Sequence, residues 1–343
     1  MSNPCFSWHT AILDQLNLAR QTGRIAHGLL FHGPAGVGKH HFARVLAKSL
    51  FCSHPTSTGE GCDACRSCRQ FDAQTHPDFL YLTPEEGKGQ IRIDQVRDLT
   101  ADLGLTAFYG GLKIAVIDPA EAMNPFAANS LLKTLEEPPA DSLIVLVTEQ
   151  PGRLLPTIRS RCQMIRFDLP AQSTAQAWLL EQGHAADAAD IGLGYAEGAP
   201  LLAERFLTEN LVDMDANLDQ ELADLILNRT DAVTVADGWN RNYPLDLVMR
   251  GMIGRTRALI WSKLGCDGPE PTFFQARLAT AIKQLAERAD TENATRYLAL
   301  LYQSRTWLST TANKPALLET LLTPWRHQLR GPYTESMNDI FRG

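Results

Sequence analysis

The chain has 343 residues, of which 44% are hydrophobic and 21% are charged, and its formal net charge is −7. This composition excludes a disordered or fibrous protein, and at about 100–200 residues per domain the length predicts two or three domains. A protein that grips duplex DNA by itself usually carries a basic excess, so the acidic balance predicts that any contact with nucleic acid is local or shared with partners.

The sequence carries no visible targeting or membrane signal. The longest strongly apolar stretch, residues 143–147, is far shorter than the roughly 18 residues that cross a bilayer. The first ten residues lack the basic start and apolar centre of a secretion signal. We therefore expect a cytoplasmic protein without membrane contact, in a reducing compartment where clustered cysteines hold metal more often than they form disulfides.

Residues 25–168 alternate short apolar runs with helical patterns, which predicts an α/β unit built on a parallel sheet. Apolar residues at helical spacing mark helices near 42–50, 96–103 and 131–135, and Gly152–Ile158 is read as a further helix. The expected strands are 28–32, 79–82, 113–118, 143–147 and 163–167.

After Pro170 the strand-like runs end, and helical periodicity rich in alanine and leucine continues to about residue 329. Two clear apolar faces are Phe274, Leu278, Ile282 and Leu285, and Leu317, Leu318, Leu321 and Leu322. Breaks are expected at 194–200 and 210–219. The predicted domains are therefore 1–168, 169–209 and 210–331, followed by a tail at 332–343.

Residues 33–40, GPAGVGKH, match the phosphate-binding loop G-x-x-x-x-G-K-[ST] at seven of eight positions, between a predicted strand and a predicted helix. Glycines let backbone N–H groups surround phosphate oxygens, and a lysine reaches the outer phosphates. The candidate nucleotide-binding residues are Gly33, Gly36, Gly38 and Lys39. The eighth position should supply a Mg²⁺-binding hydroxyl, but it is His40, so ATP binding and an inherited loop without nucleotide are equally open.

The sequence following the third predicted strand also departs from an active ATPase. Asp118 is the natural Walker B carboxylate, yet the next position, where motor ATPases place a glutamate that orients water, is Pro119. Glu121 lies three residues beyond Asp118 and is read as a carboxylate of a first helical turn. Because both a Mg²⁺ ligand and a water-orienting group are missing, we predict a catalytically silent site.

Four cysteines, Cys52, Cys62, Cys65 and Cys68, follow the pattern C-x9-C-x2-C-x2-C. Four thiolates at such spacing satisfy tetrahedral Zn²⁺ and leave no position for water, which predicts a structural site. The segment has too few apolar residues to fold without a metal. An iron–sulfur cluster or free thiols are the alternatives, and His54 and His76 are not needed as ligands.

Together these features resemble the clamp-loader subunits of bacterial DNA polymerase III, which are AAA+ proteins. The match extends over nearly the whole chain and is most specific in NSLLKTLEEPP at 129–139. The degraded nucleotide site is similar to that of the non-hydrolysing subunits rather than of the ATP-hydrolysing gamma/tau subunits. The further matching motifs, in chain order, are GPAGVGK, the four cysteines, His76-Pro77-Asp78, Ser160-Arg161-Cys162 and Asn313-Lys314-Pro315-Ala316-Leu317-Leu318-Glu319.

The resemblance implies an α/β AAA+ domain at 1–168 with an inserted zinc module at 52–68, an all-α lid at 169–209 and an all-α collar at 210–331 that assembles a ring. It further implies a hetero-pentamer with gamma/tau and delta subunits, which loads the sliding clamp onto primer-template DNA as part of the polymerase holoenzyme. Arg161 would enter the ATP site of the adjacent gamma/tau subunit as an arginine finger, while this chain would have no ATPase activity of its own.

Two further positions bear on nucleotide sensing in that family. The stretch 198–202 lacks the arginine with which the lid of active relatives senses the γ-phosphate, and Thr148 would occupy a phosphate-sensing position at the end of its strand.

Two other functions stay open. An autonomous AAA+ ATPase would require Glu121 or His40 to replace the missing groups. A zinc-dependent DNA-binding module has little support, because only Arg66 and Arg69 lie near the cysteines and the net charge is negative.

Overall fold

The computed structural model describes residues 4–85, 88–209, 211–265, 289–305, 308 and 313–327. The chain divides into two compact units, residues 1–174 and 175–343. The expected helical face from Phe274 to Leu285 and the expected tail at 332–343 lie outside the described residues. The finer division of the second unit into a lid and a collar stays a prediction.

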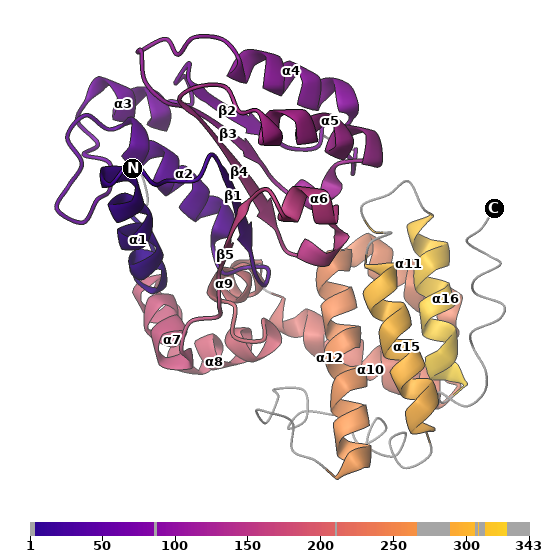
Figure 1. Ribbon diagram of the computed structural model, residues 1–343. Helices are drawn as coiled ribbons and strands as arrows, with labels where there is room; N and C mark the ends of the chain where they lie inside the picture. The colour runs from indigo at the N-terminus through magenta and orange to yellow at the C-terminus, as the bar shows by residue number, and fades with distance from the viewer. Residues whose placement is uncertain are drawn as a thin grey trace. The chain divides into compact units, whose positions relative to one another are not determined.

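The first unit is built on a five-stranded parallel sheet in the order β2-β3-β4-β1-β5 (Figure 1). All five predicted strands are confirmed, and every residue of β3 and β4 is buried, as expected of apolar strands covered on both faces. The strands are β1 (Gly28–His32), β2 (Phe79–Leu82), β3 (Lys113–Ile117), β4 (Ser142–Thr148) and β5 (Gln163–Arg166).

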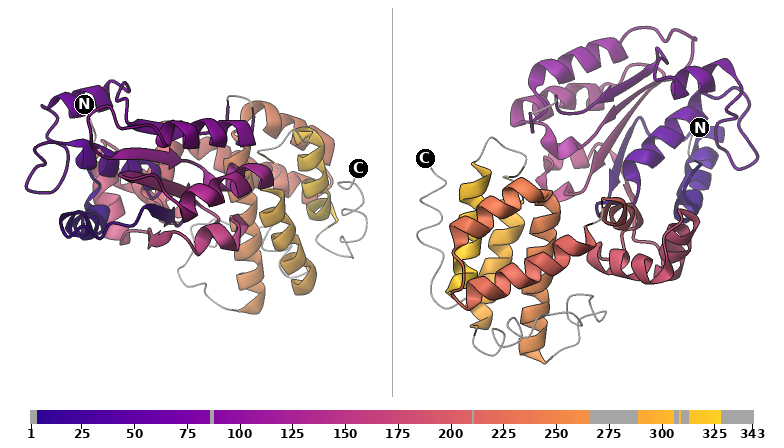
Figure 2. Two further views of the ribbon diagram at one scale, coloured as in Figure 1. Left: turned by 45° about the horizontal axis from the view of Figure 1, so that its top comes forward. Right: turned by 180° about the vertical axis from the view of Figure 1, so that it is seen from behind.

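Helices cover both faces of this sheet (Figures 1 and 2). Side chains alternate along each strand, so Leu29 and Phe31 of β1 join the core beneath one helical layer, while Leu30 joins the other. The first layer contains α1 (Thr10–Gln21), α2 (Lys39–Phe51) and α3 (Arg66–Asp72). The second contains α4 (Ile93–Leu103), α5 (Pro125–Glu136) and α6 (Pro156–Arg159). The sequence patterns predict α2, α4 and α5 but not α1 or α3.

The helix predicted for Gly152–Ile158 is wrong as a single element. The chain forms a 3₁₀ turn at Pro151–Arg153 and then the short α6, which begins at Pro156. Leu155, which precedes that proline, has φ −53° and ψ 134°. A proline disfavours helical backbone at the preceding residue, and Leu155 is extended, so the helix is interrupted at this point.

Within the described residues, the second unit is helical throughout (Figure 2). The predicted break at 194–200 is confirmed, because one helix ends at Tyr195 and the next begins at Pro200. The elements are α7 (Gln172–Glu181), α8 (Ala186–Tyr195), α9 (Pro200–Thr208), α10 (Val212–Ile226), α11 (Ala232–Asn242), α12 (Leu245–Leu264), α15 (Thr291–Ser304) and α16 (Lys314–Arg326).

The predicted break at 210–219 is confirmed only at its start, because α9 ends at Thr208 and α10 already begins at Val212. Its buried Met214 and Leu218 lie one turn apart and carry the apolar face through the polar stretch. Two acidic residues within the predicted break, Asp215 and Asp219, form ion pairs with the buried Arg255 of α12. Acidic side chains that neutralise a buried guanidinium belong to the core rather than to a turn.

The parallel strands bring three chemistry-bearing segments to one edge of the sheet. β1 ends at His32 just before residues 33–40, β3 ends just before Asp118, and β4 ends at Thr148. Since β4 lies between β1 and β3, the segments that follow these strands are neighbours at the carboxyl edge, where open α/β sheets bind their ligands. None of the described helices combines the length and apolar character needed to cross a membrane.

Candidate functional site

The phosphate loop, residues 33–40, connects β1 to α2 with the backbone shape that its glycines allow. Gly33, Gly36 and Gly38 have φ values of 152°, 73° and 97°, a region that other residues rarely adopt. A Cβ atom on Gly33 would lie 2.1 Å from the carbonyl oxygen of Phe167. The conformation and the close packing both require glycine here.

The lysine of this loop is turned onto the loop itself. Lys39 Nζ donates hydrogen bonds to the carbonyl oxygens of Gly33 at 2.9 Å and Pro34 at 2.6 Å, and the side chain is buried. A nucleotide phosphate would therefore have to replace carbonyl partners that already satisfy the ammonium group.

Three side chains meet where a Mg²⁺ ion would be held between the phosphate loop and the end of β3. His40 Nδ1 lies 3.3 Å from Asp118 Oδ2, and Tyr81 Oη donates a hydrogen bond to the same oxygen at 2.7 Å. Burial and the neighbouring Asp118 carboxylate raise the pKa of Tyr81, so the phenol keeps its proton and acts as a donor. The carboxylate expected to serve the metal thus has two protein partners. The sequence reading missed Tyr81, although it belongs to β2, the strand paired with β3.

The other candidate catalytic groups at this edge also serve local structure. Glu121 Oε1 accepts a hydrogen bond from the backbone N–H of Glu149 at 3.0 Å, and Thr148 Oγ1 accepts one from the N–H of Gln150, also at 3.0 Å. Both side chains therefore support the turn that follows β4. The arginine-free stretch 198–202 belongs to the second unit, where α9 begins at Pro200.

An aromatic segment that the sequence reading also missed lies against the phosphate loop. Trp8 Nε1 donates to the carbonyl oxygen of Val37 at 3.0 Å, and the Phe6 ring stacks on Trp8 with centroids 4.7 Å apart. A Cβ atom on Gly38 would lie 2.8 Å from the Phe6 ring. His9 is buried beside Phe167, and burial, with help from the charges of His41 and Lys39, lowers its pKa to about 3. We call residues 5–9 the N-terminal cover.

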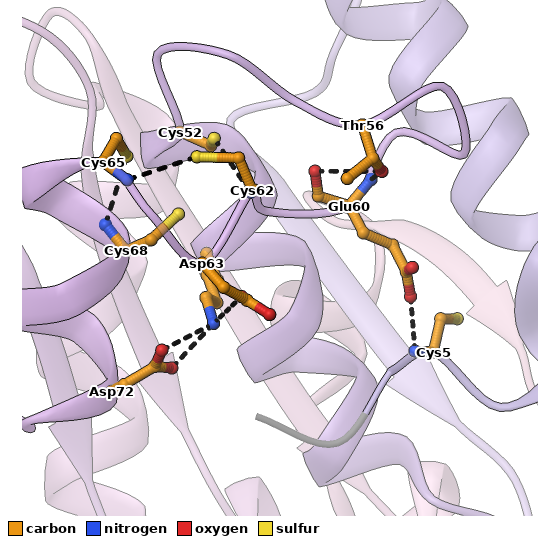
Figure 3. Close-up of polar contacts among 10 residues, drawn as sticks. Cys5, Cys52, Thr56, Glu60, Cys62, Asp63, Cys65, Cys68 and Asp72 are labelled. Carbon is orange, nitrogen blue, oxygen red and sulfur yellow. Dashed lines mark hydrogen bonds and ion pairs between the residues drawn. The ribbon is translucent and has the colours of Figure 1, made fainter. Parts of the chain in front are cut away.

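The four predicted cysteine ligands come together at the other end of α2 (Figure 3). Their sulfur atoms all lie within 4.8 Å of one another, close enough to share one ion. Backbone N–H groups point at three of these sulfurs: that of Cys62 at Cys52, that of Cys65 at Cys62 and that of Cys68 at Cys65, at 3.3, 3.3 and 3.4 Å. Such donors stabilise thiolates, the form that binds metal. The group could hold a metal ion, and tetrahedral zinc fits a set of four sulfurs.

The charge state of one ligand shows the effect of these donors. Burial alone would raise the pKa of Cys65, but the backbone N–H groups of Cys68 and Ser53 lower it to about 6. Neither nearby histidine joins the cluster. His54 contacts Ser53, and the buried ring of His76 stacks on Phe51 with centroids 4.0 Å apart.

A buried lysine ties residues 52–68, the cysteine module, to α2. Lys48 Nζ contacts Asp63 within the module and donates to both carboxylate oxygens of Asp72 on α3 at 2.8 Å (Figure 3). Burial would lower the pKa of Lys48, but the hydrogen bonds to the two carboxylates outweigh this effect and raise it. The ammonium group keeps its charge, and the two carboxylates neutralise it. This pairing attaches the cysteine module to α2, the helix that follows the phosphate loop.

Arg161 lies in the turn between α6 and β5 with its guanidinium partly open. One third of its side chain is exposed. Nη1 donates to the carbonyl oxygen of Thr157 at 2.9 Å, and Nη2 forms an ion pair with Glu136 at the end of α5. Glu136 is part of the LEEPP sequence, so two motifs far apart in the chain meet here.

Comparison with known proteins places the chain in a family. Residues 8–171 match the family model described as DNA polymerase III, delta subunit. DNA polymerase III subunit delta' of Pseudomonas aeruginosa is 35% identical over 331 residues, which cover 95% of this chain and 98% of the relative. The chain belongs to the DNA polymerase III delta' family.

Other matches agree with this family. Subunit delta' of Escherichia coli strain K12 is 38% identical over 174 residues, 51% of this chain and 52% of that protein. Subunit tau of Salmonella typhimurium is 35% identical over 167 residues, 49% of this chain and 24% of that protein. These matches agree that the chain is related to subunits of DNA polymerase III, as the sequence motifs predicted.

Proposed function

We propose that this chain is a non-hydrolysing AAA+ subunit of the clamp loader that supplies Arg161 to the ATP site of an adjacent gamma/tau subunit. In this role it helps to load the sliding clamp onto primer-template DNA in a hetero-pentamer with gamma/tau and delta subunits. Its contribution is positional and electrostatic, and the hydrolytic chemistry occurs in the neighbouring subunit.

The contact of His40 and Tyr81 with Asp118 is the observation that carries the proposal. A P-loop ATPase holds Mg²⁺ through a hydroxyl at the position of His40 and an aspartate at the position of Asp118. Here these two side chains contact each other, and Tyr81 donates to the same carboxylate oxygen. With Pro119 in place of a water-orienting glutamate, the geometry supports a site without hydrolysis.

Arg161 is suited to act outside its own chain. Its guanidinium is planar, permanently charged and partly exposed, and contacts with Thr157 and Glu136 fix its direction. A guanidinium that meets a transferring phosphoryl group stabilises the charge of the transition state, an effect worth about 10³–10⁵ in rate in GTPases. Its fixed direction reduces the side-chain ordering needed on assembly.

The remaining parts of the chain have supporting roles in this proposal. Cys52, Cys62, Cys65 and Cys68 would hold a structural Zn²⁺ ion that stabilises residues 52–68. The helices at 169–209 would form the lid, and those at 210–331 would form the collar. The residues that would bind nucleotide, without turnover, are Gly33, Gly36, Gly38 and Lys39.

The test is Arg161→Ala in the reconstituted clamp loader, with Arg153→Ala as a matched control. Arg153 is an exposed arginine of the preceding 3₁₀ turn. Assembly, followed by gel filtration, should be unchanged in both variants. We expect DNA-stimulated ATP hydrolysis to fall for Arg161→Ala by up to the share of the one site that this arginine serves, because hydrolysis at that site loses its finger while the other sites keep theirs. Equal hydrolysis in the two variants would contradict the finger role.

A further inference from the structure

The N-terminal cover has its own anchors on the phosphate loop and α2. Trp8 bonds to Val37, Phe6 packs on Gly38, and His41 Nε2 contacts the carbonyl oxygen of Pro4 at 2.9 Å. The Phe6 and His41 rings also lie 4.5 Å apart between centroids. These contacts join the first described residues to the loop that would bind phosphate.

A loop of the cysteine module is fixed beside this cover. The carbonyl oxygen of Gly59 accepts hydrogen bonds from Asn17 Nδ2 of α1 at 3.2 Å and from Ser49 Oγ of α2 at 2.5 Å. Gly59 has a φ of 77°, and a Cβ atom there would lie 2.0 Å from Asn17 Nδ2. The loop therefore sits tightly on the two helices, with no room for a side chain at this position.

Glu60 joins this loop to the cover. Its Oε1 atom accepts a hydrogen bond from the backbone N–H of Cys5 at 2.5 Å (Figure 3). Its Oε2 atom accepts one from Thr58 Oγ1 at 3.2 Å. The N–H of Glu60 donates to Thr56 Oγ1 at 3.1 Å. The carboxylate is thus oriented from both sides, and it lies two residues before the cysteine ligand Cys62.

We propose that the cysteine module, through Glu60, holds the N-terminal cover across the phosphate loop, so that metal occupancy of the module controls how readily the loop opens. Glu60 lies two residues before Cys62 in the chain, and its carboxylate accepts from Cys5. The following residues Phe6 and Trp8 then contact Gly38 and Val37. The element with two states is the cover, which is either seated or released. The control by metal occupancy rests on the zinc site proposed above, whereas the attachment of the cover by Glu60 does not.

The test is hydrogen–deuterium exchange of the full chain, comparing Glu60→Ala with Glu60→Gln. The alanine variant lacks an acceptor for the Cys5 N–H group, whereas glutamine keeps one. We expect exchange at residues 6–9 and 35–38 to rise on the order of 10-fold in Glu60→Ala, the effect of losing one charge-assisted hydrogen bond. In Glu60→Gln it should rise by less than about 3-fold, because a neutral acceptor remains. Zinc content, measured in parallel, should not change in either variant.

Three further samples separate the possible outcomes. Cys5→Pro removes the donor and should behave as Glu60→Ala does, while Cys5→Ala keeps the N–H group and should behave as the unchanged chain. Removing metal from the unchanged chain with a chelator should also raise exchange at residues 35–38. Unchanged exchange there in both Glu60→Ala and Cys5→Pro would overturn the proposal. A response to these variants without a response to chelation would overturn the metal control.

Discussion

The phosphate loop and the cysteine module lie at the two ends of one helix, α2, and they differ in what their side chains are free to do. The phosphate loop has the glycine backbone of a binding site, but Lys39 bonds to the loop's own carbonyl groups. The cysteine module has little apolar content, yet its four sulfur atoms converge on one point. The comparison teaches that a loop can have the backbone shape of a binding site while its key side chain bonds within the chain, whereas a segment with little apolar content can still bring four ligands together.

Replacement of the cysteine ligands is expected to have the largest effect on metal content and stability. Replacing Cys62 and Cys65 with serine should release about one metal equivalent and lower the free energy of unfolding by more than about 3 kcal/mol, since structural zinc supplies about 10–16 kcal/mol in zinc-finger peptides. Metal release with a chromogenic chelator and urea unfolding measure the two effects. Cys162→Ala, outside the cluster, is the control and should keep the metal; equal metal content in all three proteins would show that other groups bind it.

The burial of His9 in the N-terminal cover gives the next largest effect, a dependence of the free energy of unfolding on pH. Its folded-state pKa of about 3 lies below the ordinary value of 6.5, so the unfolded chain binds more protons between these values. Stability is complete above pH 6.5 and falls as the pH drops toward 3, by about 2–4 kcal/mol at pH 4. His9→Phe should remove this part of the pH dependence in urea unfolding. Parallel pH curves for the two proteins would contradict it.

Lys48 tests the attachment of the cysteine module to α2. Lys48→Met leaves Asp63 and Asp72 without their shared cation and should cost about 1–3 kcal/mol, because the two carboxylates are 61% and 37% exposed and water compensates part of the loss. Lys48→Arg keeps the charge and should lose less. Thermal unfolding compares the two, and a methionine variant as stable as the unchanged chain would show that the ion pairs add nothing.

The phosphate loop itself gives the smallest expected effect. Purified alone with Mg²⁺ and primed DNA, the chain should release no phosphate from ATP above background, and Lys39→Ala should leave that value unchanged. The assay is steady-state phosphate release. Turnover that disappears with Lys39→Ala would make the chain a motor in its own right and would remove the contrast between the two loops.

The sequence predicts well those features whose cause is local. The five strands follow from short apolar runs, and the loop at 33–40 lies between a strand and a helix as its motif requires. The cysteine cluster is likewise predicted from spacing, because its four ligands lie within seventeen residues. Each of these signals is contained in a short window.

Features that depend on residues distant in the sequence could not be predicted from such short patterns. Tyr81 reaches Asp118 because β2 pairs with β3, and Phe6 reaches Gly38 because the chain before α1 folds back over α2. The break predicted at 210–219 extends too far, because Asp215 and Asp219 lie in α10 and pair with Arg255, which is distant in the sequence. A polar residue in a short stretch of sequence does not reveal a partner that is distant in the chain.

The ion pair between Arg161 and Glu136 affects how much free energy this arginine gains when it binds another anion. A guanidinium already matched by a carboxylate does not gain a full ion pair when phosphate approaches, because it exchanges one anion for another. Because both side chains are partly exposed, the pair with Glu136 contributes little free energy, and a group with several charged oxygens competes with it effectively. Glu136 therefore competes with any incoming anion for Arg161, and this competition favours anions that carry more charge.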